Sequence, residues 1–75
     1  MKPLKTRSVT VSGATYEIRA WRQGDWFRVR AFREGQAVGL TFGVDATTRQ
    51  DFELYYGDAL EQLMLVVEGD LRKPR

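Results

Sequence analysis

The 75-residue chain contains no cysteine and no histidine, and both absences exclude classes of function. Without cysteine it can form neither a disulfide framework nor a thiolate zinc site. It also lacks the residue that most often acts as a catalytic base and the thiol that acts as a nucleophile. We therefore expect a protein that is not an enzyme and that holds no cofactor and no metal ion.

Long apolar runs are missing as well. The longest one, Leu63–Val67, is much shorter than the roughly 20 residues that a membrane-spanning helix requires. The segment Met1–Thr6 has no apolar stretch of the kind that signal peptides contain. We expect a cytoplasmic protein with no membrane partner.

The charges nearly balance, because 12 lysine and arginine residues face 10 aspartate and glutamate residues, for a net charge of +2. Such a balance does not by itself indicate a nucleic-acid-binding protein, so the positions of the charges matter more than their sum. Size matters too. A short chain without a disulfide or a metal buries only a modest core, and oligomerisation is a common remedy.

Three dipeptides that end in glycine divide the first half of the chain at intervals of eleven residues: Ser12-Gly13, Gln23-Gly24 and Glu34-Gly35. Glycine at the second position supplies the positive φ that two-residue hairpin loops need. The segments between them are rich in β-branched and aromatic residues, which favour strands. The pattern predicts a four-stranded antiparallel β-meander, with strands at 6–11, 14–22, 25–33 and 36–44.

Loops at these dipeptides also predict which residues face one another. In the second hairpin, Arg19 is expected opposite Arg28, and Trp21 opposite Trp26. Alternate residues of all four strands then gather on one apolar face. This predicted core face consists of Val9, Val11, Tyr16, Ile18, Ala20, Phe27, Val29, Ala31, Val38, Leu40, Phe42 and Val44.

The second half of the chain has apolar residues at helical spacing and predicts a helix over 48–68. We expect this helix to pack on the apolar sheet face, so that residues 1–75 form a single α+β domain. Residues 70–75 are expected to form a basic tail.

The ends and the middle of the helix carry their own signals. Thr47 or Thr48 is the expected N-cap, and Gly69 is the expected residue just after the helix end. Gly57 leaves open whether the helix is kinked or is split into two, with Asp58 as a second N-cap.

One stretch of the helix is apolar on every side. Its five consecutive residues, Leu63, Met64, Leu65, Val66 and Val67, point around the whole helix circumference. A single sheet covers only part of that circle. We therefore expect a homodimer in which this stretch forms the interface.

The face of the sheet opposite the core is unusual, since a solvated sheet face is normally polar. It is expected to carry the candidate nucleic-acid-binding residues Arg19, Trp21, Trp26, Arg28, Arg30 and Phe32. Arginine suits bidentate contacts with phosphate, and aromatic rings in a positive groove hold single strands by stacking. This composition favours a module that binds single-stranded DNA or RNA.

Other interpretations remain open. Tryptophan and arginine are also enriched in protein interfaces, so the same face suits a protein partner or a second copy of the chain, without any nucleic-acid activity. A purely structural role is a third interpretation, in which Trp26 covers Gly43 on the neighbouring strand. Asp58 and Glu61 are the nearest approach to a catalytic carboxylate pair, and we interpret them as part of a solvated helix face.

Three segments suggest a known family: Phe-Arg-Val-Arg-Ala-Phe at 27–32, Val-Gly-Leu-Thr-Phe at 38–42, and the acidic-capped helix that contains Phe52. With them, about half of the chain resembles the PC4-like single-stranded DNA-binding proteins. The resemblance implies a homodimer whose sheets present a groove for nucleic acid. The six arginine and aromatic residues named above would then make the contacts.

Overall fold

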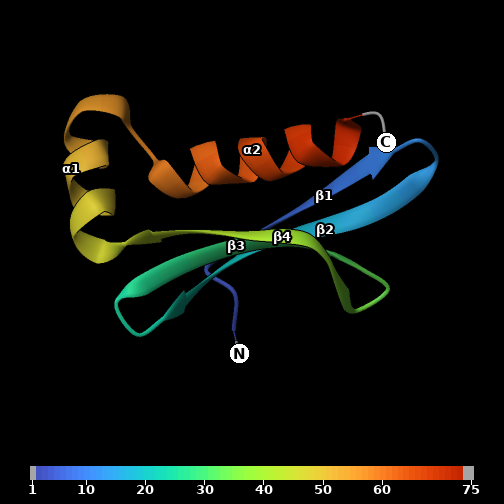
Figure 1. Ribbon diagram of the computed structural model, residues 1–75, viewed down its shortest axis with the longest axis horizontal. Coiled ribbons are helices and arrows are strands. Elements are labelled where there is room, and N and C mark those ends of the chain that lie inside the picture. The colour runs from blue at the N-terminus through green and yellow to red at the C-terminus, as the bar shows by residue number, and fades with distance from the viewer. Residues whose placement is uncertain (1, 74–75) are drawn as a thin grey trace.

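The computed structural model describes residues 2–73, which form four strands followed by two helices. The elements are β1 (Lys5–Val11), β2 (Ala14–Gln23), β3 (Trp26–Arg33), β4 (Gln36–Asp45), α1 (Ala46–Tyr56) and α2 (Ala59–Arg72). The strands form one antiparallel sheet in the order β1-β2-β3-β4. Helix α2 lies along one face of the sheet, whereas α1 stands at one end of it (Figure 1). The predicted α+β meander with C-terminal helices is confirmed.

In the first hairpin Val11 pairs with Ala14, as expected for a two-residue loop at Ser12-Gly13, but the register of the second hairpin differs from the prediction by two residues. Arg19 pairs with Arg30, and Trp21 pairs with Arg28. The predicted pairs Arg19–Arg28 and Trp21–Trp26 are therefore wrong. A shift of two residues leaves every side chain on the face where it was expected, because the side-chain period of a strand is two.

The cause of this shift is the glycine of the middle loop. That loop consists of Gly24 and Asp25, with Gly24 at the first position and a φ of 62°. A type II′ hairpin turn takes glycine at the first loop position. The flanking loops instead have a positive φ at both positions, as at Ser12 (51°) and Gly13 (81°), which is typical of type I′ turns. The outer two dipeptides thus form type I′ loops themselves, whereas the middle loop lies one residue further along and is of type II′.

A β-bulge interrupts β4 and corrects a second prediction. Ala31 pairs with Val38 and Val29 pairs with Phe42, so three residues of β4 lie opposite Arg30. The bulge begins at Gly39, whose φ of 72° suits glycine. Leu40, predicted to lie in the core, is 67% exposed, because the bulge takes it out of the regular alternation.

The core lies between the sheet and α2. Its most deeply buried large side chains are Ile18 and Val29 from the sheet and Leu60 and Met64 from α2. Each such side chain stabilises the fold by about 1.5–3 kcal/mol through removal from water. Helix α1 contributes no buried residue.

The helical region is split at Gly57, which is one of the two alternatives that the sequence leaves open. The single span 48–68 is wrong at both ends, because α1 starts at Ala46 and α2 continues to Arg72. Gly69 thus lies inside α2 and not after its end. Of the predicted basic tail 70–75, residues 70–72 are helical, and residues 74–75 lie outside the described residues.

Both helices begin with an aspartate. The side chain of Asp45, and not that of Thr47 or Thr48, caps α1 by accepting a hydrogen bond of 2.7 Å from the backbone N–H of Thr48. The same bond lowers the pKa of Asp45 below its usual value. Asp58 caps α2 as predicted, by accepting from the N–H of Glu61.

Ion pairs attach the start of α2 to β1. Lys5 forms a salt bridge with Asp58, and Arg7 forms one with Glu61. The hydrogen bond from Lys5 lowers the pKa of Asp58. The two carboxylates considered as a catalytic pair thus act as partners of β1 cations.

Candidate nucleic-acid interface

The sheet face that points away from α2, called the outer face below, carries all six residues that the sequence singles out. Along β2 and β3 buried residues alternate with more accessible ones, and α2 packs on the buried set. The accessible set therefore points outward. It includes Arg19, Trp21, Trp26, Arg28, Arg30 and Phe32.

Two arginines face each other near the middle of the outer face. Arg19 is the direct cross-strand partner of Arg30, and like charges in this position destabilise a sheet. Arg19 forms a salt bridge with Glu17, and Arg30 Nη2 donates a hydrogen bond of 2.9 Å to the carbonyl oxygen of Gly39. Each guanidinium thus has its own acceptor. Arg30 Nε is buried and has no partner among residues 2–73.

Aromatic rings and guanidinium groups stack on this face. The guanidinium carbon of Arg19 lies 4.4 Å from the ring centre of Phe32, and that of Arg28 lies 4.9 Å from the ring of Trp26. The rings of Trp21 and Phe32 are 6.2 Å apart and inclined at 60°. Contacts of this type contribute about 0.5–1 kcal/mol each at exposed sites. They hold the long arginine side chains in defined positions.

The absence of a side chain at Gly43 makes room for Arg28. A Cβ atom at this position would lie 2.9 Å from Arg28 Nη1 and 3.2 Å from Arg28 Cδ. Gly43 is the cross-strand partner of Arg28, so the arginine lies across the backbone of β4. This finding replaces the interpretation that Trp26 covers Gly43. Trp26 instead pairs with Gln23 and Asp45, at the end of the sheet.

The predicted dimer residues are divided by the structure. Met64 and Val67 are buried in the core against the sheet, so they are not accessible to a second chain. Leu65 and Val66 are exposed, and Leu63 is half-buried. The all-round apolar stretch is thus covered by the sheet on one side only.

Sequence reasoning missed the most exposed large apolar residues within 2–73, which lie on α1. Tyr55 is 81% and Tyr56 72% exposed, and Leu54 is exposed to a similar degree. The sequence does contain a signal of this exposure. Apolar and polar residues are not separated onto opposite sides of the helix within 46–56, so no side of it is suited to burial.

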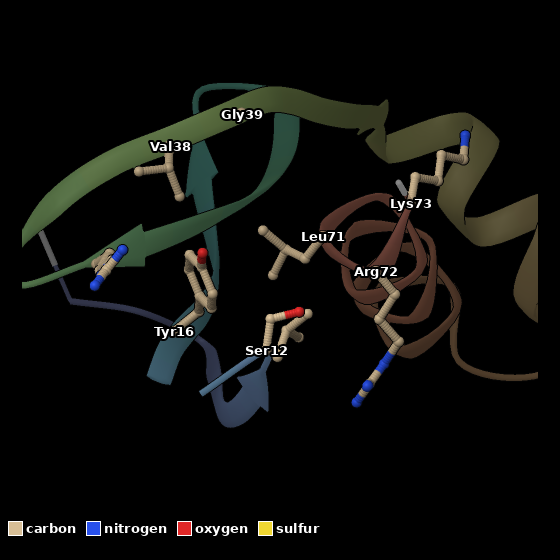
Figure 2. Close-up of a pocket in the computed structure, with 9 residues that line it drawn as sticks. Ser12, Tyr16, Val38, Gly39, Leu71, Arg72 and Lys73 are labelled. Carbon is tan, nitrogen blue, oxygen red and sulfur yellow. The ribbon is translucent and has the colours of Figure 1, made fainter. Parts of the chain in front are cut away.

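A hollow lies between the sheet and the C-terminal end of α2, with a volume of about 680 Å³ (Figure 2). Leu71 points from α2 toward Tyr16 and Val38 on the sheet, whereas the Arg72 side chain points away from them. The guanidinium carbon of Arg33 lies 5.9 Å from the ring centre of Tyr16. The hollow has apolar walls and a cationic rim, and it is open to solvent.

Within residues 2–73, no group of three or more acidic side chains is close enough to hold a metal ion. No helix in the same range is long and apolar enough to cross a membrane.

Comparison of the chain with models of protein families, with curated proteins and with solved structures finds no significant match. The resemblance to PC4-like proteins stays a prediction.

Proposed function

We propose that the outer face binds single-stranded nucleic acid and that the protein is a non-enzymatic binding module. The observation that carries this proposal is the cross-strand pair Arg19–Arg30 with the aromatic rings beside it. Placing two like charges opposite each other costs stability. An anion such as phosphate removes that cost, because it is attracted to both guanidinium groups.

The aromatic residues account for a second part of the ligand. Trp26 and Phe32 each present a ring on the same face as the arginines, and both are already in contact with a guanidinium group. A base that stacks on an exposed ring contributes about 1–3 kcal/mol whatever its identity. Rings beside guanidinium groups suit unpaired bases and favour little sequence preference.

A salt titration tests the phosphate contacts. The probe is a fluorescently labelled oligodeoxythymidine of about 16 nucleotides, the upper end of the site size for small sheet modules. Three phosphate contacts give a log–log slope of affinity against salt of about −2, at about −0.7 per contact for single strands. We expect Arg19→Gln, Arg28→Gln and Arg30→Gln each to reduce the slope by about 0.7.

The matched control is Arg72→Gln. Arg72 is exposed on α2, on the other side of the sheet, so its removal changes the net charge equally and leaves the outer face intact. Equal effects of all four variants would indicate attraction by net charge alone. Absence of binding at low salt would refute the proposed function.

A second candidate function is protein interaction without nucleic-acid activity. The exposed apolar side chains of α1 favour it. The two candidates use different surfaces, so they predict different variants. If substitutions in the outer face abolish oligonucleotide binding, nucleic-acid binding is supported. If the chain forms a complex with a protein but binds no oligonucleotide, protein interaction is supported.

A further inference from the structure

An apolar groove lies between α1, α2 and the end of β4. Its volume is about 360 Å³, within the roughly 300–1,000 Å³ in which proteins bury small ligands. The apolar side chains that line it include Val44 of β4, Phe52 of α1, and Leu63 and Val66 of α2. None of the residues that line the groove is charged.

A projecting cluster of rings adjoins this groove. Phe52 belongs to the groove wall, and its ring centre lies 5.0 Å from that of Tyr56, which in turn lies 6.4 Å from that of Tyr55. The two tyrosines are the most exposed large apolar side chains of the described residues. The same surface thus combines a hollow and a projection, which meet at Phe52.

We propose that this surface is a homodimer interface, in which the Tyr55–Tyr56 cluster of each copy packs into the groove of the other. A projection and a hollow that adjoin on one chain can engage twice around a two-fold axis, which closes the assembly at two copies. Tyrosine is enriched in such interfaces. The proposal is independent of the outer face and so does not rest on nucleic-acid binding.

Charge and area favour a second copy as the occupant. The groove has no charged lining residue, and Arg49 and Glu61 beside it are bound to Glu53 and Arg7. The groove of one copy can therefore receive the uncharged tyrosines of the other without like-charge repulsion. At about 150–250 Å² per tyrosine, the cluster and groove expose several hundred Å², near the upper limit of roughly 300–600 Å² for monomers. Doubling that area approaches the roughly 1,200 Å² of a small stable interface.

Sedimentation velocity of the full chain over a micromolar to millimolar range tests the proposal. We expect a species of twice the chain mass of 8.7 kDa. Tyr56→Glu and Val66→Lys place charges on the projection and in the groove. Each should weaken the dimer roughly thirtyfold or more, the scale for loss of a central interface side chain. An equimolar mixture of the two should dimerise again, because the new charges attract.

Leu54→Glu is the matched control, since Leu54 is 71% exposed on the other flank of α1, where it lines a separate hollow with Phe27. It should leave the dimer intact, and circular dichroism should show the same helix content in all variants. A wild-type chain that is monomeric throughout would overturn the proposal. A dimer that Tyr56→Glu and Val66→Lys leave unchanged, or that Leu54→Glu weakens equally, would also overturn it. The same holds for an equimolar mixture of the two charged variants that stays monomeric, and for a dimer that only Trp26→Ala disrupts.

Discussion

The two faces of the sheet are built by alternate residues of the same strands, yet they have different chemistry. The inner face consists of apolar side chains packed against α2, among them the ring of Phe27, and its central residues are almost fully buried. The outer face carries arginines that stack on aromatic rings, with like charges directly opposite each other. The inner face therefore determines whether the chain folds, and the outer face retains groups whose arrangement costs stability.

The same contrast separates the two helices. Helix α2 buries Ala59, Leu60, Met64 and Val67, whereas α1 buries nothing and exposes its tyrosines. A small domain has a small free energy of unfolding, so exposed groups that do not increase it are candidates for contacts with other molecules. Stability and binding can accordingly be changed separately by substitution.

The largest effect is expected on the inner face. Met64→Ala removes a side chain that is 1% exposed and leaves a cavity, which typically costs about 2–5 kcal/mol. A chain of 75 residues has a total stability of roughly 4–11 kcal/mol, so much of the fold's stability would be lost. The measurement is the free energy of unfolding in urea.

The neighbouring Leu65→Ala is the control for Met64→Ala. Leu65 is 46% exposed on the same helix, and its truncation should cost less than about 1 kcal/mol. Equal costs at the two positions would contradict the assignment of Met64 to the core and Leu65 to the surface.

A medium effect is expected on the outer face, and on binding instead of folding. Trp26→Ala should weaken oligonucleotide binding by about 1–3 kcal/mol if one base stacks on the ring. It should change the free energy of unfolding by about 1 kcal/mol at most, since the ring is exposed and its loss removes only surface contacts, including that with Arg28. Trp21 and Trp26 both lie on this face, so tryptophan fluorescence reports on binding directly.

Tyr55→Ala is the matched control for Trp26→Ala, because Tyr55 is an exposed aromatic residue on α1 and does not belong to the outer face. It should leave oligonucleotide affinity unchanged at concentrations where the protein is monomeric. A loss of folding stability in Trp26→Ala as large as that in Met64→Ala would mean that the two faces are not functionally distinct.

The alternation of side chains made the fold and the division into faces predictable. Period-two patterning places Ile18 and Val29 inside and Arg19 and Arg30 outside whatever the exact pairing. The pairing itself was less predictable, because Gly24 can occupy either loop position and only the turn type decides between them. Since the register decides which arginines are neighbours, the geometry of the candidate site could not be derived fully.

Two further differences arise from features that local patterns do not reveal. Leu40 fits the alternation of a regular strand, but the bulge at Gly39 displaces it. The apolar residues of α1 suggest a buried helix, but none of its side chains is fully buried. It meets the core through the half-buried Ala46 and through Arg49, whose guanidinium carbon lies 4.3 Å from the ring centre of Phe27. In both cases tertiary geometry decides which side chain is covered.

The smallest effect is expected at the junction of the sheet and α2, and it depends on pH. Asp58 has a pKa below its usual 3.8, mainly because Lys5 donates a hydrogen bond to it. The unfolded chain therefore takes up this proton at a higher pH than the folded chain, so the stabilisation is complete above about pH 5 and is lost as the pH falls through 3.8 to the lower folded value. Asp58→Asn keeps an acceptor for the helix cap but removes the charge, so the urea midpoint should decline less steeply with acidification. Salt should weaken the effect, because the pair is partly exposed.

Asp51→Asn is the control, since Asp51 is exposed on α1 and forms none of the salt bridges found among residues 2–73. An equally shallow decline in that variant would show that net charge, and not the contact between β1 and α2, governs the acid sensitivity.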